Sequence, residues 1–201
     1  FTYDYCLEHA AELEAVYGML ADDESRRVYA SIINFKISGD IRYLLDVTTP
    51  KAEIYRKIIR LTPNEVYVDL GAYNGDTIAE VLQYTRGKYI RIYAVEPDRK
   101  NFKKLCKYLD GMRYVNAYHA VAWCKDTTVP FSTKAGRQSA VSAFGQEIEA
   151  RSVDSILKGR PATIIKMDVE GCEREALWGA SQTIAHFSPK LMVSLYHRNE
   201  D

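Results

Sequence analysis

Cysteine is scarce and scattered in this 201-residue sequence. None of the four residues Cys6, Cys106, Cys124 and Cys172 belongs to a C-x-x-C pair. A zinc-binding motif is therefore not indicated. We interpret the cysteines as reduced, mostly buried small hydrophobic residues.

Net charge and long apolar runs are also absent. The 27 basic residues balance the 27 acidic ones, and no Lys/Arg tract points to nucleic acid or an anionic membrane as the main partner. No run approaches the roughly 20 apolar residues that cross a bilayer, and the start has no signal-peptide pattern. These features predict a cytoplasmic protein. The sequence opens on Phe1 and not on Met, so we expect that a tag or a few native residues, with a leader as a further alternative, are missing before it.

The first part of the chain has a helical pattern. Apolar residues recur every three or four positions from Leu7 to Leu20, and similar patterns follow near 25–40 and 50–61. No ionisable pair or glycine loop in this part indicates chemistry. We predict a helical N-terminal cap over residues 1–62, with the alternative that it helps to wall a substrate pocket.

From residue 63 to 201 short strands alternate with helices, which predicts an α/β domain with a mostly parallel sheet covered by helices on both faces. The predicted strands are Val66–Leu70, Ile90–Val95, Arg113–Ala117, Thr163–Asp168 and Lys190–Tyr196, and the predicted helices lie near Thr77–Tyr84, Arg99–Leu109 and Cys172–His186. The interval 126–160 fits this alternation poorly. It is expected to form either a pair of short strands or a mobile loop.

The turn after the first strand, in the segment VDLGAYNGDT, is the first candidate binding site, because ligands of open parallel sheets bind beyond the carboxyl ends of the strands. Gly71 and Gly75 allow a tight turn and a close approach of a ligand. Thr77 and Glu80 fit a capping box, which would begin a helix whose free N–H groups face the same crevice.

The residues of this turn discriminate between two nucleotide ligands. A dinucleotide fingerprint requires G-x-G-x-x-G, but Tyr73 and Asp76 occupy its second and third glycine positions. An aromatic ring and a carboxylate are unfavourable beside a pyrophosphate. A ligand with a cationic end and no phosphate fits better, and Asp69 supplies negative charge for an ammonium group. S-adenosylmethionine carries both an ammonium and a sulfonium.

The second strand ends in the segment AVEPD, about twenty residues beyond the glycine turn. At this distance an acidic side chain, here Glu96, accepts hydrogen bonds from both ribose hydroxyls of a nucleoside. Pro97 offers a flat apolar surface to an adenine. The alternative is that Glu96 merely caps the helix that begins near Asp98.

The segment IIKMDVEGCEREALWGA ends a buried strand and begins a helix. Together with VDLGAYNGD, AVEPD and the late SLYH, this order resembles the FkbM family of methyltransferases over roughly Glu65 to His197. The resemblance implies a Rossmann-like class I methyltransferase fold, S-adenosylmethionine as cofactor, and O-methylation, often of sugars or secondary metabolites. In the family's commoner first motif Asn follows Gly-Ala directly, whereas here Tyr73 precedes Asn74. The sequence also stops at Asp201, before the two further strands that such methyltransferases normally form as a hairpin at the sheet edge, which predicts an exposed edge at the fifth strand.

These motifs lead to a set of predicted site residues. The predicted cofactor-binding residues are Asp69, Gly71, Ala72, Tyr73, Asn74, Gly75, Glu96, Pro97 and Asp168. A hydroxyl acceptor requires a base, and the candidates at the strand tips are His197, Asp168 and Glu170. Each has a structural alternative: His197 would lie in a chain-terminal loop, and Asp168 or Glu170 would cap the next helix. Glu173 and Glu175 are expected to favour the start of that helix.

Other segments carry weaker indications. The aromatic stretch from Ala117 to Trp123, which includes His119, would lie near the adenine or form core. Arg137 and Ser139 would contact the acceptor or lie in a solvated loop. No metal is expected, because Asp168 has no Asp-Asn pair downstream.

The favoured hypothesis is an S-adenosylmethionine-dependent methyltransferase that acts on a hydroxyl of a saccharide or small metabolite. Its expected partner is a small-molecule or glycan acceptor, and a homo-oligomer is left open. The alternatives are a non-catalytic nucleoside-binding module and, less favoured because of Tyr73 and Asp76, an NAD-dependent oxidoreductase.

Overall fold

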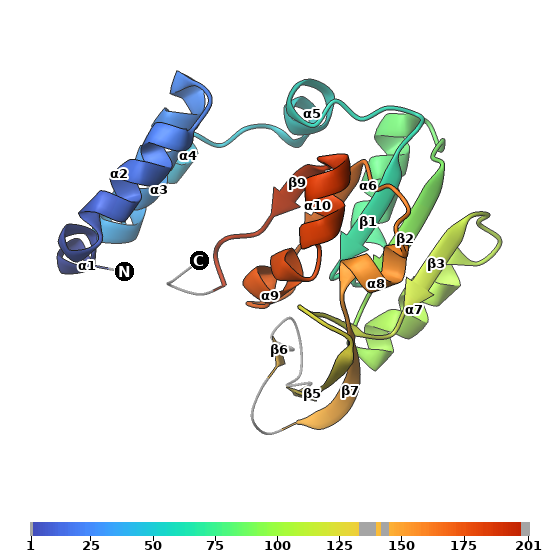
Figure 1. The fold of residues 1–201 in the computed structure, drawn as a ribbon. Coiled ribbons are helices and arrows are strands. Elements are labelled where there is room, and N and C mark those ends of the chain that lie inside the picture. The colour runs from blue at the N-terminus through green and yellow to red at the C-terminus, as the bar shows by residue number, and fades with distance from the viewer. Residues whose placement is uncertain (1, 133–139, 142–144, 198–201) are drawn as a thin grey trace. The chain divides into compact units, whose positions relative to one another are not determined.

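The computed structural model describes residues 2–132, the strand backbone at 140–141 and residues 145–197 (Figure 1). The chain divides into two compact units, residues 1–54 and residues 55–199. Arg137 and Ser139, which were expected to contact the acceptor or to lie in a solvated loop, lie outside the described residues. Within the described part, no helix is both long enough and apolar enough to span a bilayer.

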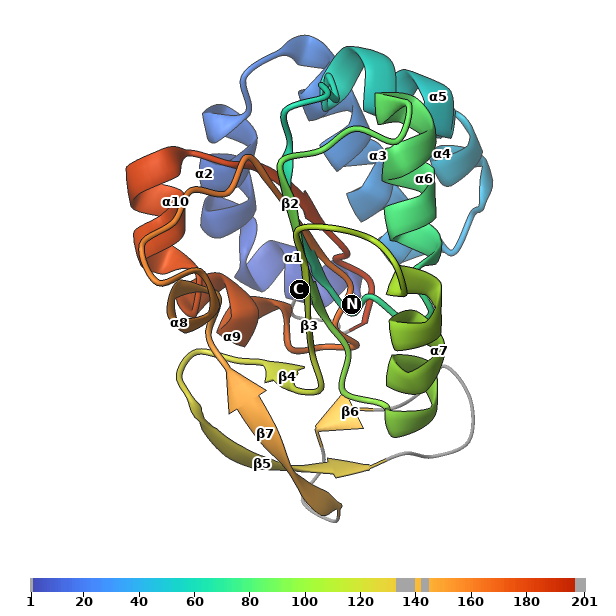
Figure 2. The ribbon, with the colours of Figure 1, turned by 90° about the vertical axis from the view of Figure 1, so that its right-hand side faces the viewer.

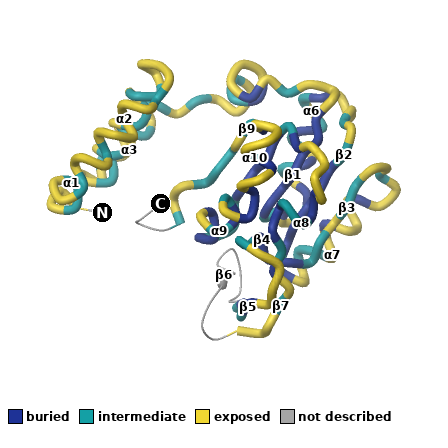
Figure 3. The backbone as a smooth tube through the Cα atoms, viewed as in Figure 1, coloured by how far each residue is buried: buried dark blue, intermediate teal, exposed yellow. Residues whose placement is uncertain are grey.

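The described residues of the first unit are mostly helical. The helices are α1 (Tyr3–Glu8), α2 (Ala10–Met19), α3 (Asp23–Ser38), α4 (Arg42–Leu45) and α5 (Lys51–Glu53), and the π-helical turn η1 (Ile54–Ile58) follows. Asp22 caps α3 by accepting a hydrogen bond from the Ser25 N–H, and Gly39 ends it in the left-handed conformation. The described residues of α1 to α5 include no buried side chain (Figure 3).

The second unit is built on a parallel five-stranded sheet with the order β3-β2-β1-β8-β9. These strands are β1 (Val66–Leu70), β2 (Arg91–Val95), β3 (Val115–Tyr118), β8 (Ile164–Met167) and β9 (Lys190–Val193). The prediction of five strands in a mostly parallel sheet is confirmed, although β9 ends three residues earlier than Tyr196. From β1 the chain continues to β2 and β3 on one side of β1, and it later returns to β8 and β9 on the other side of β1. Ligands of such sheets bind where the strand order reverses, so the expected ligand site is a crevice at the tips of β1 and β8.

Helices cover both faces of this sheet (Figure 2). The helices α6 (Asp76–Thr85) and α7 (Arg99–Leu109) lie on one face, and α8 (Val153–Leu157), α9 (Glu173–Trp178) and α10 (Ser181–Phe187) on the other. Alternate β1 residues Val66, Val68 and Leu70 share one apolar core with residues of α8 and α9. Because both faces are covered, every residue of β1 is buried.

The single helix predicted over Cys172–His186 is wrong, since α9 and α10 are separate helices. The Gly179 carbonyl accepts a hydrogen bond from the Asp154 N–H of α8 at 2.9 Å. The Asp154 carboxylate in turn accepts from the N–H of Thr183 at 2.9 Å. A Cβ at Gly179 would lie 2.0 Å from the Trp123 carbonyl oxygen. The local pattern is helical throughout, but contacts with distant segments separate α9 from α10.

The segment that fits the alternation poorly forms strands of a second sheet with the order β4-β7-β5-β6. Its strands are β4 (Val121–Ala122), β5 (Thr127–Ser132), β6 (Ala140–Val141) and β7 (Gln146–Arg151). Val121, Val129, Phe131 and Ala150 form its small apolar core. Figure 2 shows this sheet beyond the carboxyl ends of the central strands. Its Phe131 side chain lines the pocket described below.

Candidate functional site

The turn after β1 is held against the tips of the two neighbouring strands. The N–H groups of Gly71 and Ala72 both donate to the Val95 carbonyl at the end of β2, at 2.9 and 3.0 Å. Gly71 has φ +77°, and a Cβ there would lie 1.9 Å from the backbone carbonyl oxygen of Asp168. Glycine is therefore required at this position both by the backbone conformation and by the close approach of a second chain segment.

Tyr73 and Asn74, the two residues that depart from the commoner family motif, differ in their positions in the turn. Tyr73 adopts φ 49°, a strained conformation for a non-glycine residue, and its ring lies 5.9 Å from the Lys104 ammonium. The Asn74 side chain accepts from the Asp76 N–H at 3.2 Å. Tyr73 lines the pocket described below, whereas Asn74 supports the turn.

The predicted capping box at the start of α6 is wrong. The helix begins at Asp76, and its N-cap is Gly75, which makes no side-chain capping bond. The Thr77 hydroxyl instead donates to Asp69 Oδ2 at 2.6 Å. Glu80 accepts from the Tyr55 hydroxyl at 3.0 Å. Both side chains thus have tertiary partners that the local pattern does not reveal.

Glu96 connects the first loop with the second. One carboxylate oxygen accepts from the Tyr73 N–H and the other from the Asp98 N–H, each at 2.8 Å. Burial raises the pKa of Glu96 to about 7, although both N–H groups favour the charged form. The N-cap of α7 is Asp98, whose own side chain accepts from two N–H groups of the first turn. Glu96 therefore lies at the tip of β2 with its carboxylate on the turn of β1.

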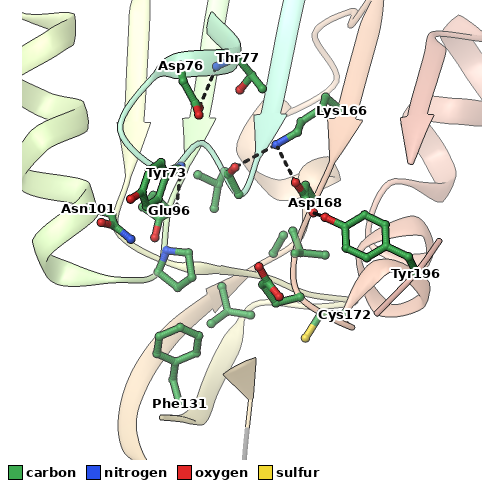
Figure 4. Close-up of a pocket in the computed structure, with 17 residues that line it drawn as sticks. Tyr73, Asp76, Thr77, Glu96, Asn101, Phe131, Lys166, Asp168, Cys172 and Tyr196 are labelled. Atoms are coloured by element: carbon green, nitrogen blue, oxygen red, sulfur yellow. Dashed lines mark hydrogen bonds and ion pairs between the residues drawn. The ribbon is translucent and has the colours of Figure 1, made fainter. Parts of the chain in front are cut away.

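Lys166 of β8 is a site residue that the sequence reasoning missed. It is only 8% exposed, and its ammonium donates to the Gly71 carbonyl at 3.0 Å. It also lies 3.4 Å from Asp69 Oδ1. A further carboxylate oxygen, Asp168 Oδ2, lies 3.9 Å away (Figure 4). Lys166 thus neutralises carboxylates on two neighbouring strand tips. One indication of this role was available in the sequence, because Lys166 lies two residues before Asp168 in the segment IIKMDVEG.

Asp69 is fully buried beneath the turn. Burial raises the pKa of its carboxyl group, and the nearby Lys166 ammonium and Thr77 hydroxyl oppose this shift. Its negative charge is therefore directed at Lys166 inside the protein, and not toward the pocket as expected for a partner of a ligand's ammonium group.

A second cluster of polar side chains follows β8 and β9. The Nε2 atom of His197 lies 3.4 Å from Asp168 Oδ1 and 3.4 Å from Glu170 Oε2. Its Nδ1 atom lies 2.9 Å from Glu173 Oε1, which also accepts from the Val169 N–H at 3.0 Å. The three predicted base candidates are therefore neighbours. Glu173, which was expected only to favour a helix start, holds the imidazole from the other side.

A pocket of about 270 Å³ opens beside these strand tips (Figure 4). The predicted residues that line it are Gly71, Tyr73, Glu96, Pro97, Asp168 and Glu170. The predicted residues Asp69, Ala72, Asn74, Gly75 and His197 are not among its described lining residues. The lining residues that were not predicted include Thr77, Asn101, Phe131, Lys166, Cys172 and Tyr196. Phe131 belongs to the second sheet, which had no clear strand pattern in the sequence.

The aromatic stretch after β3 divides between two places. Val121 and Ala122 line the same pocket as Pro97, beside which an adenine was expected. His119 lies against Phe102, with ring centroids 5.0 Å apart, and lines a neighbouring pocket. The stretch therefore supplies small apolar groups to the main pocket, and its histidine lies outside it.

The arrangement has two chemically different ends. Glu96 and Pro97 offer a carboxylate acceptor and an apolar surface, which suit a nucleoside. Asp168, Glu170 and the nearby His197 offer proton acceptors, which suit general base catalysis on a bound hydroxyl. Asp168, Glu173 and His197 also place potential metal ligands within 4.8 Å of one another.

Comparisons with known proteins identify the family of this chain. The family model described as "Methyltransferase FkbM domain" matches residues 69–201. The chain is similar to the crystal structure of methyltransferase FkbM from Methylobacillus flagellatus KT, with 28% sequence identity and a TM-score of 0.83 over 98% of this chain and 51% of that chain. This chain therefore spans about half the length of that protein.

Two more distant structures share lower similarity. An rRNA methylase from Streptococcus thermophilus is 14% identical, with a TM-score of 0.47 over 77% of this chain and 76% of that chain. A precorrin 8w decarboxylase from Methanobacterium thermoautotrophicum is 16% identical, with a TM-score of 0.42 over 76% and 68%. Among curated proteins, none matches significantly.

Proposed function

This chain belongs to the family of FkbM methyltransferases, and from this premise we propose that it uses S-adenosylmethionine to methylate a hydroxyl group of a saccharide or small metabolite. The family match supports methyl transfer as the reaction. The cofactor and the acceptor class are inferred from the residues of the pocket.

The charge of the pocket is the observation that best supports the cofactor. Its described acidic lining residues are Asp76, Glu96, Asp168 and Glu170, and its basic one is Lys166. Such a lining favours a ligand with a net positive charge and disfavours a pyrophosphate. S-adenosylmethionine carries a sulfonium, an ammonium and one carboxylate, and has no phosphate. In this assignment Glu96 accepts hydrogen bonds from the ribose hydroxyls, and Val121 and Ala122 flank the adenine together with Pro97.

Methyl transfer to oxygen is an in-line displacement at the sulfonium methyl, in which the acceptor oxygen bonds to the methyl carbon as the carbon–sulfur bond breaks. The acceptor must lose its proton, so a base is required. Asp168 and Glu170 line the pocket, and His197 Nε2 lies 3.4 Å from each of them. We assign the proton acceptor to this group, and the acceptor molecule to the same end of the pocket.

Cofactor binding gives the first test. S-adenosylmethionine and S-adenosylhomocysteine at 100 times their Kd should each raise the free energy of unfolding by about 2.7 kcal/mol, measured by thermal denaturation. NAD at the same concentration should have no effect. Protection by NAD alone would reverse the assignment of the ligand.

Turnover gives the second test. A labelled methyl donor incubated with glycan and metabolite extracts should label an acceptor, and treatment of the product should show an ether that resists mild base. Cofactor binding without labelling of any extract would instead favour a non-catalytic nucleoside-binding module.

Two substitutions at the pocket lining should differ in their effect on cofactor affinity. Asp168→Asn should lower the affinity for the cofactor more than Glu170→Gln does, because Asp168 also faces Lys166.

A further inference from the structure

The imidazole of His197 lies among three carboxylates. Its Nε2 atom lies 3.4 Å from Asp168 Oδ1 and 3.4 Å from Glu170 Oε2, and its Nδ1 atom lies 2.9 Å from Glu173 Oε1. The side chain is only 9% exposed. The charge state of this ring decides its role in proton transfer, because only a neutral imidazole can accept a proton from a bound hydroxyl.

The contact with Glu173 places a proton on Nδ1. Glu173 is buried, and its Oε1 atom also accepts from the Val169 N–H at 3.0 Å. An oxygen that accepts from an amide repels a bare ring nitrogen at 2.9 Å, whereas it attracts an N–H group at the same distance. Nδ1 is therefore a donor, and a neutral ring would carry its lone pair on Nε2.

The surroundings of Nε2 disfavour such a lone pair. Two carboxylate oxygens, Asp168 Oδ1 and Glu170 Oε2, lie within ion-pair distance of this atom. Lys166 lies 3.9 Å from Asp168 Oδ2 but 3.4 Å from Asp69 Oδ1, so its charge is shared with a carboxylate outside the cluster. A second proton on the ring places a positive charge between carboxylates that lie at both of its nitrogens.

Burial and charge act in opposite directions on this ring. Burial disfavours an imidazolium, since it removes water from a charged group. A neutral ring, however, would leave Glu173 as a buried carboxylate without an opposite charge at Nδ1, and its Oε2 atom has no hydrogen-bond partner among the described residues. A buried charge that has lost its partner is strongly destabilising, so the effect of the carboxylates is the larger one.

We propose that His197 carries a proton on both ring nitrogens at neutral pH, and that it is a positioning residue for Asp168 and Glu170 and not the base. These two carboxylates line the pocket, whereas His197 is not among its described lining residues. The imidazolium holds them from outside the pocket, and Glu173 holds the imidazolium from Nδ1. One consequence rests on the proposed function: the base is then Asp168 or Glu170, which narrows three candidates to two.

Nitrogen NMR of the histidine rings tests this state without cofactor or acceptor. An imidazolium has two protonated nitrogens with similar chemical shifts, whereas a neutral ring has one protonated and one bare nitrogen with well-separated shifts. The chain has four histidines, and the signals of His197 are assigned by their loss in His197→Gln. At pH 7.5, where a histidine with the ordinary pKa of about 6.5 is mostly neutral, we expect two protonated nitrogens in His197.

Two variants measure the contribution of the carboxylates. Glu173→Gln keeps an acceptor for the Val169 N–H, and it should lower the ratio of charged to neutral His197 about tenfold or more, because an opposite charge within ~4–6 Å favours the charged form. Glu170→Gln should lower this ratio less, since its side chain is 39% exposed and water screens its charge. Glu170→Gln is informative even where Glu173→Gln does not fold.

His9 provides the matched control in the first unit. Its Nδ1 atom lies 3.2 Å from Glu12 Oε2, in an exposed pair with a single carboxylate among its described contacts. Water screens such a pair, so His9 should show one bare nitrogen at pH 7.5. Neither Glu173→Gln nor Glu170→Gln should change its signals.

The pH dependence of methyl transfer separates the two roles of His197 where the labelling experiment finds an acceptor. At saturating S-adenosylmethionine, loss of the second ring proton should lower the rate of labelling, because the carboxylates lose the charge that holds them. A histidine that acts as the base would instead make the rate rise as this proton is lost, and such a rise would overturn the positioning role.

Two results of the NMR measurement also overturn the proposal. One is a bare nitrogen in His197 of the unaltered chain at pH 7.5, which would return this residue to the candidates for the base. The other is a ratio of charged to neutral His197 that is unchanged in both Glu173→Gln and Glu170→Gln. Neither result bears on the cofactor assignment, because that assignment is tested by thermal denaturation with S-adenosylmethionine.

Discussion

The two halves of the pocket are stabilised in different ways. The half at the tips of β1 and β2 is held by backbone groups: Gly71 and Ala72 donate to Val95, and Glu96 accepts from the Tyr73 and Asp98 N–H groups. The half at the tips of β8 and β9 is held by side chains, in a cluster of three carboxylates and one histidine. Lys166 links the halves through the Gly71 carbonyl and Asp168. The half at the tips of β1 and β2, where we propose that the nucleoside binds, depends on backbone geometry. The acceptor half, as we propose for the tips of β8 and β9, depends on charge balance.

Removal of the link between the halves should have the largest effect. Lys166→Met leaves Asp69 buried without its cation, and breaking a buried pair in this way typically costs about 3–5 kcal/mol. Burial already raises the pKa of Asp69, and loss of Lys166 should raise it further. A raised carboxyl pKa gives stability that is present at low pH and lost as pH rises through the folded pKa. Urea unfolding should therefore show a larger deficit at pH 8 than at pH 5.

The double variant Lys166→Met/Asp69→Asn is the matched control for this prediction. Because it removes the uncompensated charge, it should recover part of the lost stability, with a coupling of about 1–3 kcal/mol in a double-mutant cycle. Equal deficits at both pH values, or no coupling, would mean that Lys166 acts only through the Gly71 carbonyl.

Disruption of the backbone half should have the next largest effect. Gly71→Ala places a Cβ 1.9 Å from the Asp168 carbonyl oxygen at a left-handed position, and overpacking together with the strained backbone should cost about 2–4 kcal/mol. The affinity of this variant for S-adenosylmethionine should fall together with its stability, as measured by calorimetry at a temperature where the variant is folded.

Gly87 offers a control with the same backbone strain and no crowding. It has φ +73°, and no atom lies within 4 Å of the position of a Cβ. Gly87→Ala should therefore cost only about 1–2 kcal/mol and leave the affinity for the cofactor unchanged. If both variants lose the same free energy of unfolding, the close approach of the two strand tips does not contribute to stability.

The smallest effect concerns the protonation of Glu96. Its pKa of about 7 means that the carboxylate form, to which we assign the hydrogen bonds from both ribose hydroxyls, is lost below neutral pH. The Kd for S-adenosylmethionine should therefore rise about tenfold for each unit of pH well below 7. Isothermal titration between pH 5.5 and 8.5 measures this dependence.

The same group affects the free protein in the opposite sense. Because burial raises the pKa of Glu96, its ionisation lowers the free energy of unfolding as the pH rises through the range up to about 7. Glu96→Gln should weaken binding and flatten its pH dependence, whereas Asp76→Asn, another change at the pocket lining, should leave the dependence in place. A pH-independent Kd in the unaltered protein would contradict the ribose assignment.

Local features of the sequence predicted some of the lining of the pocket at the tips of β1 and β2, although four of the predicted cofactor contacts there are not among its described lining residues. The predicted β1 has the observed bounds, and Gly71, Glu96 and Pro97 all line the pocket. These residues follow directly from strand ends and turn chemistry. The acceptor half was predicted less completely, because Glu173 and Lys166 were taken for helix-start and strand residues, and Phe131 lay in a segment with no clear pattern.

The sequence by itself determined the order of the five central strands, and with it the edge of the sheet at which the pocket opens, because the apolar periodicity of each strand depends only on its own residues. Only the tertiary structure decided which charges meet at that edge. Lys166 contacts a residue 95 positions away, and His197 contacts one 24 positions away. The break between α9 and α10 likewise depends on a carbonyl of Trp123 and an N–H of Asp154. Such pairings are set by which side chains share a buried volume, and no local spacing encodes that.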